Sequence, residues 1–394
     1  MGEAKLFSSG LSRAKDPGKA IEELASKIHQ DFQGKSCDLA VLFVSEGYEG
    51  LDAAKLAQDF KKLVSPTALI GCNSCGVIGD QNEIEMQPAI SMLAMHLPSV
   101  KISPFSFSPV GLETMKSGKG LVEYLDLYPT DRPNFILLAD PMSTDVNKLL
   151  SLFNESYQGS PVVGGLASGT VMNSPNWLLL GDDVFSEGAV GLALSGEIEF
   201  DIVVSQGCRP IGEPYTVTKA DRNILYELAG KPALKVLTDL FLKLSVKDQR
   251  LAQNALFVGL AMDEGRLKLE RGDFLIRNIL ATDEEVGALS IGEIIETGQT
   301  LQFQLRDAET SKEDLKVLLK KSSREGDAKK CGALLVSCCG RGKGLYGETD
   351  HDVKMIQSLR GPLMLTGFFA NGELGPIDRK NYIHGYTSSL TIIR

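Results

Sequence analysis

The feature that most restricts the fold of this chain is a unit that recurs along it. The stretches "LIGCNSCGVIGD" (69–80) and "LTGFFANGELGPID" (365–378) each follow an apolar, strand-like run, and another strand follows each of them, at 88–97 and 381–393. Their glycines have the same spacing: Gly71, Gly76 and Gly79 correspond to Gly367, Gly372 and Gly375. Self-similarity of this kind indicates one supersecondary unit that is used more than once.

The sequence upstream of the glycines repeats as well. "LAVLFVS" (39–45) resembles "ALLVSCC" (333–339), and a helical pattern follows each run, at 52–63 and 350–359. A looser third copy has a strand, a helix, a glycine-rich stretch and a strand at 134–140, 144–157, 160–169 and 188–196. A fainter fourth copy begins at 254–265. The unit is therefore strand, helix, strand, glycine-rich loop, strand.

This unit predicts an α/β fold with mixed, mostly parallel sheets. The first two strands are expected to be parallel neighbours through a right-handed crossover, and their unbroken apolar runs suit a sheet covered on both faces. The third strand is expected to turn back antiparallel. At 394 residues the chain is long enough for two domains, which we place at 1–200 and 201–394. The charged segment 306–330 is predicted to be a solvated helix that serves as scaffold.

Composition excludes several classes of partner. The formal net charge of −10 argues against a nucleic acid or an anionic membrane. No apolar run reaches the roughly 18 residues of a transmembrane helix, and "MGEAKLFSSG" lacks the apolar stretch of a signal peptide. Seven cysteines in such a chain indicate reduced thiols rather than a disulfide framework. We therefore expect a cytoplasmic protein with no nucleic-acid or membrane partner.

Cys72 and Cys75 form a Cys-x-x-Cys pair, which is typical of redox dithiols and of half-sites for zinc. Zinc needs four ligands, and the remaining cysteines form no second pair of this spacing. The C-terminal copy of the unit has Phe368 and Asn371 at the two positions. These observations favour a structural or pocket-lining role, with redox or metal chemistry as the alternative. We predict no metal and no cofactor.

Residues 342–347, "GKGLYG", fit the glycine pattern of a dinucleotide-binding turn. The next strand lacks the acidic residue that would confirm such a site, so no nucleotide is predicted. What remains is a set of backbone N–H groups near a helix N-terminus, which suit a carboxylate or a phosphate. Arg341, beside them, could hold that anion bidentately.

The stretch "TDHD" (349–352) offers Asp350, His351 and Asp352 as metal ligands, but consecutive helical residues do not face one way. Thr349 with Asp352 also matches a capping box that opens a helix. His351 has no structural role in that interpretation, and we expect it to point into a pocket.

Arg209 lies between two prolines in "QGCRPIGEP". Two roles are open: a structural ion pair with an acid such as Glu213 or Glu373, or capture of an anionic ligand at the domain junction, where pockets tend to lie. "ANGELGP" has the composition of a turn, yet Asn371 and Glu373 could accept hydrogen bonds from a ligand amine. Further residues in the glycine-rich stretches are expected to line the pocket: Cys72, Asn73, Gly165 and Cys208.

These stretches resemble a known family. "SQGCRPIGEPYTVTKADRNILYELAGKPAL" (205–234), "GRGKGLYGETDHDVKMI" and "LTGFFANGELGPI" are similar to the FIST sensory proteins, and "PVVGGLASG" and "GAVGLALSG" fit their N-terminal domain. The resemblance covers about 35–394 and implies an N-terminal and a C-terminal FIST domain. It also implies an input module of intracellular signal transduction that binds small ligands such as amino acids. We expect neither an F-box nor an output domain, because no such module fits in the residues left over. Cys75 departs from the small residue usual in that loop. We expect a bacterial protein.

An enzyme is the alternative. Cys208 or Cys72 as nucleophile, with His351 or His384 as base, would make a cysteine-dependent hydrolase or transferase. No local signature places these side chains together, and no Gly-x-Ser-x-Gly elbow is present. We therefore predict a sensory module without catalytic residues. It is expected to bind an amino acid or another small anion between its domains and to signal to a partner that the sequence does not name.

Overall fold

The computed structural model describes residues 3–172, 174–266, 268–322 and 331–394, which form two compact units. Unit 1 comprises Met1–Val204, Lys316–Ile383 and Thr387–Arg394. Unit 2 comprises Ser205–Leu315 and His384–Tyr386. The chain thus leaves unit 1 close to the predicted boundary at residue 200, and its C-terminal part returns to unit 1.

Unit 1 contains three copies of the predicted unit. Repeat 1 consists of β1 (Leu6–Ser12), α1 (Pro17–Phe32), β2 (Leu39–Ser45), α2 (Ala53–Val64), β3 (Ala68–Ser74), β4 (Gly76–Gly79), β5 (Asn82–Glu85) and β6 (Ile90–His96). Repeat 2 consists of β7 (Val100–Phe107), α3 (Pro109–Thr114), α4 (Gly118–Leu125), the 3-10 helix η1 (Pro129–Asp131), β8 (Asn134–Ala139), α5 (Val146–Ser156), β9 (Val162–Leu166), the 3-10 helix η2 (Gly169–Met172), β10 (Leu178–Leu180), β11 (Asp183–Phe185) and β12 (Ala189–Gly196).

Repeat 3 is interrupted in sequence by unit 2. It consists of β13 (Phe200–Ser205), α8 (Ala308–Lys321), β22 (Gly332–Cys338), α9 (Gly342–Tyr346), α10 (His351–Arg360), β23 (Met364–Ala370), β24 (Glu373–Ile377), β25 (Lys380–His384) and β26 (Ser388–Ile393). The residues of α8 from Lys316 onward belong to unit 1.

Each repeat builds four strands of one sheet and gives its remaining hairpin to another. The sheet orders are β1-β6-β2-β3-β10-β11, β7-β12-β8-β9-β24-β25 and β13-β26-β22-β23-β4-β5. The hairpin β4–β5 of repeat 1 thus completes the sheet of repeat 3, β10–β11 of repeat 2 completes that of repeat 1, and β24–β25 of repeat 3 completes that of repeat 2. This cyclic exchange ties the three repeats into one unit.

The strand directions confirm the predicted α/β class. The central pairs β2–β3, β8–β9 and β22–β23 are parallel, and β6, β12 and β26 run antiparallel to the first strand of each pair. Three details were wrong. The sheets are mixed but not mostly parallel, because each sheet of unit 1 has one parallel pair and its other described pairs are antiparallel. The single strand expected at 381–393 is divided between β25 and β26, which lie in different sheets. The fourth copy at 254–265 is β18, which pairs antiparallel with both its neighbours.

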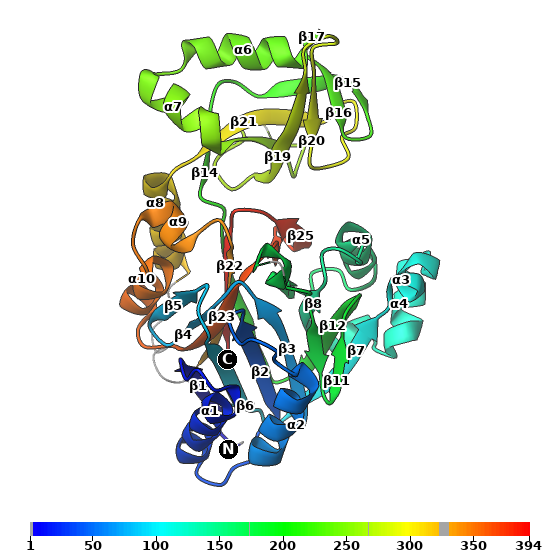
Figure 1. Ribbon diagram of the computed structural model, residues 1–394. Coiled ribbons are helices and arrows are strands. Elements are labelled where there is room, and N and C mark those ends of the chain that lie inside the picture. The colour runs from blue at the N-terminus through cyan, green and yellow to red at the C-terminus, as the bar shows by residue number, and fades with distance from the viewer. Residues whose placement is uncertain (1–2, 173, 267, 323–330) are drawn as a thin grey trace. The chain divides into compact units, whose positions relative to one another are not determined.

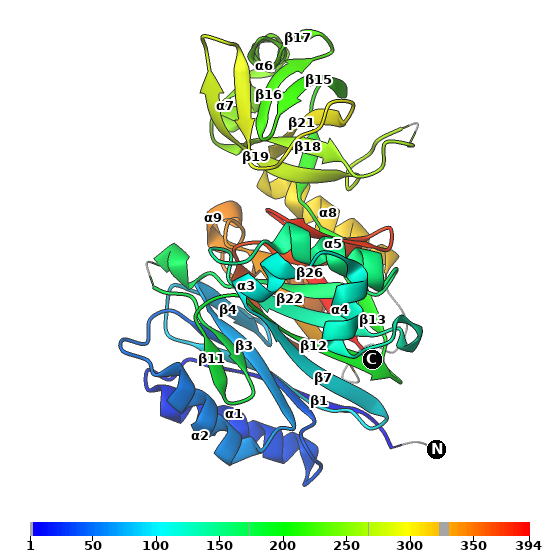
Figure 2. The same cartoon turned by 90° about the vertical axis from the view of Figure 1, so that its right-hand side faces the viewer.

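Helices α1, α2 and α5 of unit 1 begin at side chains that cap them. Asp16, Asp52 and Asp145 each precede a helix and accept a hydrogen bond from the backbone N–H three residues on, at 2.8, 2.9 and 2.9 Å. The apolar faces of α1 and α2 pack on one face of the sheet of repeat 1 (Figure 1), and α3, α4 and α5 pack on the sheet of repeat 2 (Figure 2).

The inner faces of the three sheets share one apolar core. Alternate residues of β2 divide between the two sides: Val41 and Phe43 enter the shared core, whereas Leu42 packs under the helices. Phe368 of repeat 3 meets Phe43 with ring centroids 4.5 Å apart. The unbroken apolar runs seen in the sequence follow from this burial on both faces.

Unit 2 is antiparallel. Its elements are β14 (Cys208–Pro210), β15 (Tyr215–Asp221), β16 (Ile224–Leu228), β17 (Lys231–Pro232), α6 (Ala233–Lys243), α7 (Val246–Ala255), β18 (Leu256–Ala261), β19 (Phe274–Asp283), β20 (Ala288–Ile291) and β21 (Thr300–Arg306). Strand β18 pairs with both β19 and β21, so the strands β21-β15-β16-β20-β19-β18 close into a ring. Helices α6 and α7 share its apolar core.

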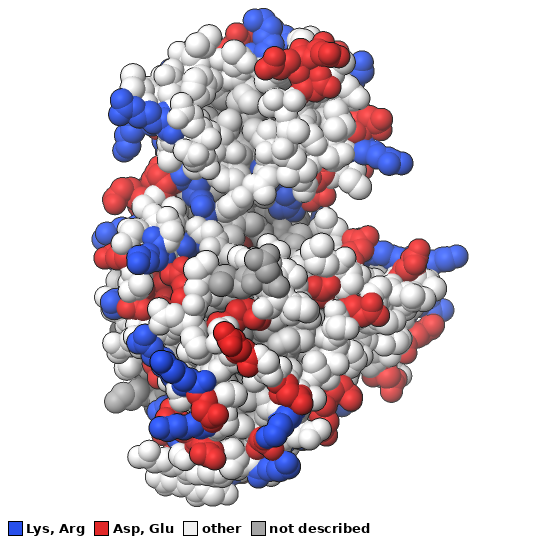
Figure 3. All heavy atoms as spheres, viewed as in Figure 1, with Lys and Arg blue, Asp and Glu red and all other residues white. Residues whose placement is uncertain are grey.

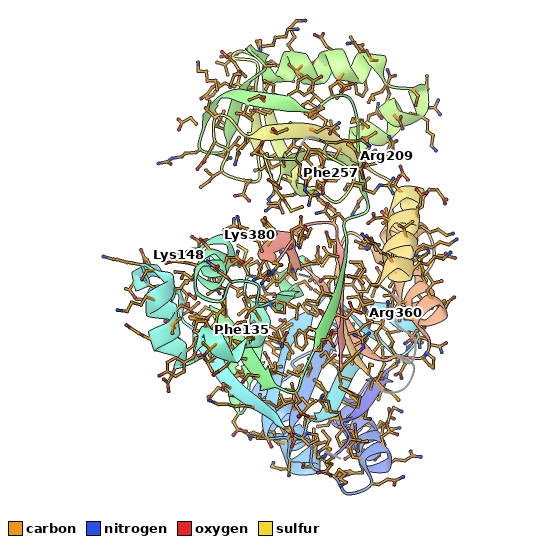
Figure 4. The ribbon with its side chains drawn as sticks, turned by 180° about the vertical axis from the view of Figure 1, so that it is seen from behind. Phe135, Lys148, Arg209, Phe257, Arg360 and Lys380 are labelled. Atoms are coloured by element: carbon orange, nitrogen blue, oxygen red, sulfur yellow. The ribbon has the colours of Figure 1, made fainter. Side chains whose placement is uncertain are left out.

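The helix predicted over 306–330 corresponds to α8, which ends at Lys321; residues 323–330 lie outside the described part of the chain. It is not fully solvated, because Leu315 and Leu319 are completely buried. Arg360 of α10, labelled in Figure 4, anchors it by donating to Leu319 O at 3.3 Å and to Ser322 Oγ at 2.8 Å.

The surface carries mixed charge. On the face drawn in Figure 3, Lys and Arg side chains are interspersed with Asp and Glu. None of the helices in the described ranges combines the length and the apolar character that a membrane span requires.

Candidate functional site

The loops that leave the parallel strands of the three repeats meet inside unit 1. The backbone N–H of Cys75, after β3, donates to Ser168 Oγ at 2.9 Å, and Ser168 follows β9. Ser168 Oγ in turn donates to the carbonyl oxygen of Phe369, in β23, at 2.5 Å. The carboxyl ends of parallel strands are where α/β proteins usually bind ligands, so a ligand site is expected beside this junction.

Asn73 holds the loop of repeat 2 against repeat 1. Its Nδ2 donates to Glu46 Oε1 at 2.7 Å and to Pro175 O at 2.9 Å, and its Oδ1 accepts from Trp177 N at 2.9 Å. The side chain is buried and these three bonds use both ends of the amide. Asn73 therefore stabilises the contact between repeat 1 and the loop of repeat 2.

Gly165 and Glu373 lie opposite each other where repeat 3 pairs with repeat 2. A Cβ on Gly165 would come within 2.7 Å of Val336 Cγ1 and 2.8 Å of Gly372 O, so the close approach requires glycine. Glu373 is fully buried and its Oε2 accepts from Thr387 N at 3.0 Å. Asn371 is exposed, and its backbone N–H donates to Leu166 O.

A cavity of about 930 Å³ opens beside the junction, within unit 1. The hairpin β4–β5 of repeat 1 supplies one wall, the segment after β22 supplies another, and Arg13 comes from the end of β1. The lining includes Arg13, Glu83, Glu85, Cys339, Arg341, Lys343 and Asp350. Of the residues proposed from sequence, Arg341 is in this lining.

Three hydrogen bonds hold the hairpin to the opposite wall. Glu85 Oε1 accepts from Lys343 N at 2.9 Å, at the start of α9. The backbone N–H of Glu83 donates to Asp350 Oδ1 at 2.7 Å, and Glu83 Oε1 accepts from Val353 N at 2.9 Å in the first turn of α10. A carboxylate is favoured at a helix N-terminus, where backbone N–H groups have no partner within the helix.

Arg341 binds a carboxylate bidentately, as its sequence context suggested, but that carboxylate is Asp352. Its Nε and Nη2 donate to Asp352 Oδ2 and Oδ1 at 2.7 and 3.2 Å, and the side chain of Arg341 is 0% exposed. Burial alone would raise the pKa of Asp352, but the guanidinium outweighs it and holds that pKa well below its usual range. The predicted capping box of Thr349 and Asp352 is wrong: α10 begins after Asp350, which caps it without a side-chain hydrogen bond.

His351 is packed beside this ion pair. Its ring stacks on Tyr346 with centroids 3.7 Å apart and an interplanar angle of 17°. Its Nδ1 lies 3.1 Å from Asp352 Oδ1, a distance at which the ring donates to the ionised carboxylate. Tyr346 Oη accepts from Arg341 Nη2 at 2.6 Å. The four side chains form one connected group, of which Arg341 lines the cavity.

Glu83 is the acid with the most perturbed environment in the cavity. It is 3% exposed, and its Oε2 has no hydrogen-bond partner among the described residues. Burial raises the pKa of Glu83 to about 8, and the negative charge of Asp352 adds to the effect; Asp350 and Glu85 contribute in the same direction. Glu83 is therefore protonated at neutral pH as long as no positively charged group lies next to its carboxyl.

This shifted pKa predicts a pH-dependent stability. Between about pH 5 and pH 8 the unfolded chain ionises Glu83 while the folded chain keeps the proton, so the free energy of unfolding falls as pH rises, by up to about 1.4 kcal/mol per pH unit. Urea unfolding of the wild type and of Glu83→Gln over this range measures the difference. We expect the variant to lose this part of the slope; identical slopes would contradict the assignment.

The cysteines named from sequence lie in apolar surroundings. Cys72 is completely buried in the shared core, and burial raises its thiol pKa, which disfavours the nucleophilic thiolate. Cys208, in unit 2, packs against Phe257, Phe274 and Ile276. His351, one of the bases considered, is engaged by Tyr346 and Asp352 as described above. Cys75 does not pair with Cys72: its sulfur lies 3.1 Å from that of Cys339.

Arg209 lies in β14 of unit 2 (Figure 4). Its Nη2 donates to Asp248 Oδ1 at 2.5 Å and its Nε to Asp307 Oδ2 at 3.4 Å. The structural ion pair foreseen for it is present, but with these two acids rather than with Glu213 or Glu373. Arg209, Cys208 and His384 belong to unit 2, whereas the other residues proposed from sequence belong to unit 1.

Sequence reasoning missed most of the polar lining: Arg13, Glu83, Glu85, Lys343 and Cys339. The alternation in "GVIGDQNEIE" with a polar turn at its centre is a signal for the hairpin β4–β5. No sequence pattern indicates which sheet that hairpin joins.

The fold defines a class of protein: an α/β protein of three interlocked repeats, with an antiparallel unit inserted in the third. The chain belongs to the FIST family, because the FIST N domain matches residues 38–231 and the FIST C domain matches residues 233–376. FIST domains are sensory domains of signal transduction.

Its relatives include mycobacterial proteins of nearly the same length. The uncharacterized protein Rv0628c of Mycobacterium tuberculosis is 36% identical over 386 residues, which cover 97% of this chain and 98% of the relative. The uncharacterized protein Mb0898c of Mycobacterium bovis is 34% identical over 385 residues, 97% of each chain. Among solved structures, cyanuric acid hydrolase aligns over 99% of both chains with 9% identity and a TM-score of 0.30, which is too low to support an argument.

Proposed function

We propose that unit 1 is a sensor for a small zwitterionic or anionic metabolite, an amino acid being the best match, and that the ligand binds in the cavity between the β4–β5 hairpin and residues 339–350. The observation that carries the proposal is the buried Glu83 carboxyl. It lines the cavity, and its Oε2 has no hydrogen-bond partner among the described residues. A buried polar atom in that situation is costly unless a ligand group satisfies it.

The charges around the cavity support a ligand with both signs. Arg13 and Lys343 are exposed, line the cavity and form no salt bridge within the described residues, so they are available to a carboxylate. Glu83 and Glu85 supply carboxyl groups of the same lining to an ammonium group, whereas Asp350 already pairs with Lys354 Nζ at 3.1 Å. The volume of about 930 Å³ is within the usual range for small-molecule sites. Arg341 is buried against Asp352 and serves to position the wall.

Binding of an amine should be linked to the ionisation of Glu83. The ammonium group favours the charged carboxylate, so Glu83 must release its proton on binding while the pH is below about 8. Affinity is then expected to rise between pH 6.5 and pH 8. The Glu83→Gln variant should bind more weakly and lose this rise.

A thermal-shift screen of the free amino acids and small anions, followed by calorimetry on those that stabilise the protein, tests the proposal. We expect Arg13→Ala and Lys343→Ala each to weaken binding of a hit by about tenfold, the usual loss for one charge-assisted contact. Lys19→Ala is the matched control, because Lys19 is exposed on α1 and does not line this cavity. Stabilisation by no compound, with protein shown by native mass spectrometry to be ligand-free, would rule the proposal out.

A further inference from the structure

Two thiols from different repeats lie next to each other at the junction. Cys75 follows β3 of repeat 1, Cys339 follows β22 of repeat 3, and their Sγ atoms are 3.1 Å apart. A disulfide bond is about 2.05 Å long, so the two sulfurs need to approach by only roughly 1 Å. Both cysteines are free thiols in the structure.

The backbone fixes both cysteines. Cys75 N donates to Ser168 Oγ at 2.9 Å, and Cys339 N donates to Ala370 O at 2.9 Å. Cys75 is 8% exposed, whereas Cys339 is half-buried and lines the cavity. The pair is therefore held in place, and a small reagent reaches it through the cavity.

The pKa values of the two thiols also favour oxidation of the pair. The hydrogen bond from Cys339 lowers the pKa of the Cys75 thiol, although burial opposes this. The pKa of Cys339 is raised, first because its proton is held by Cys75 and then by burial. One thiol thus ionises while the other keeps its proton, and the thiolate is the nucleophile that attacks oxidants.

We propose that Cys75 and Cys339 are a modification site that forms a reversible disulfide when the protein meets a hydroperoxide such as hydrogen peroxide. The Cys75 thiolate attacks a peroxide oxygen, an S–O bond forms as the O–O bond breaks, and the leaving hydroxide takes the thiol proton to become water. The sulfur of Cys339 then attacks, the S–S bond forms as the S–O bond breaks, and the hydroxyl group leaves with the proton of Cys339 as a second water.

Two thiols and one peroxide thus give one disulfide and two waters, with two electrons passing from sulfur to oxygen. The bond would join repeat 1 covalently to the segment that lines the cavity. This chemistry is independent of any ligand in the cavity.

The test is carried out on the full-length protein. Native protein is treated with a few equivalents of hydrogen peroxide, and after the peroxide is removed the protein is unfolded in urea with N-ethylmaleimide, so that the buried thiols are alkylated as well. It is then digested and analysed by mass spectrometry with and without dithiothreitol. The chain has seven cysteines; we expect two of them to escape alkylation after oxidation, in peptides linked through Cys75 and Cys339, and both to react again after reduction.

Variants separate this pair from its neighbour. Cys75→Ser and Cys339→Ser should each abolish the link, whereas Cys338→Ser, the matched control, should retain it. Circular dichroism before oxidation shows whether each variant is folded. The experiment on the wild-type protein tests the proposal even if a variant does not fold. Full alkylation of all seven cysteines after peroxide, a link between Cys338 and Cys339 instead, or a link formed only in urea would overturn the proposal.

Discussion

Gly367→Ala is expected to reduce the free energy of unfolding by at least about 3 kcal/mol, at the upper end of what overpacking costs. A Cβ on Gly367 would lie 1.8 Å from the carbonyl oxygen of Leu335, its partner in the adjacent parallel strand β22. That oxygen belongs to a hydrogen-bonded sheet at the centre of unit 1, so it cannot move aside as a flexible side chain would. Urea unfolding and the yield of soluble protein measure the effect.

The same contact occurs in all three repeats, which strengthens this expectation. A Cβ on Gly71 would lie 2.0 Å from Leu42 O, and one on Gly164 would lie 2.1 Å from Leu137 O. The matched control is Gly344→Ala: its Cβ would meet nothing within 4 Å, and it lies inside α9, where alanine is the better helix former. Equal unfolding midpoints for the two variants would show that the sheet tolerates a side chain at Gly367.

Arg341→Met is expected to reduce the free energy of unfolding by about 3–5 kcal/mol at pH 7.5, because it leaves the buried Asp352 carboxylate without its cation. The side chain of Met has a volume similar to that of Arg, so the loss of stability measures the missing charge more than a packing defect.

The pH dependence distinguishes this cause from a general packing defect. Without Arg341, the folded-state pKa of Asp352 rises above its unfolded value of about 4, so the folded protein binds an extra proton and the deficit shrinks as the pH falls toward 5. The double variant Arg341→Met with Asp352→Leu should recover part of the loss. Lys55→Met, which breaks an exposed pair with Asp59, should cost less than about 1 kcal/mol. A pH-independent deficit would assign the loss to packing instead.

Much of the local structure could be predicted from the sequence. The helices expected at 52–63, 144–157 and 350–359 are α2, α5 and α10, each shifted by no more than two residues at either end. The three parallel strand pairs and their antiparallel third strands were also foreseen, because apolar runs, helical periodicity and glycine spacing are properties of the chain itself. These patterns extend over a few residues, so they predict helices, strands and the connections between successive elements.

The site could be predicted only in part. Arg341 was recognised as an arginine that binds a carboxylate bidentately, but its partner is Asp352, 11 residues away in the sequence and part of an apparent capping box. Glu83 and Lys343 were missed because they face one cavity only after β4–β5 has crossed into the sheet of repeat 3. The Cys-x-x-Cys spacing was misleading, since Cys72 is in the apolar core and Cys75 meets Cys339 from another repeat.

The sequence by itself determined the repeated unit, its strand directions and the glycines that let adjacent strands approach, because each depends on elements that follow one another within a single repeat. Tertiary structure alone decided the cyclic exchange of hairpins, and with it the cavity, the Arg341–Asp352 pair and the Cys75–Cys339 contact. A two-stranded hairpin is barely stable alone in water and can pair with any compatible sheet edge. Its partner is therefore chosen by the packing of the whole unit, and this choice leaves no mark in the local sequence.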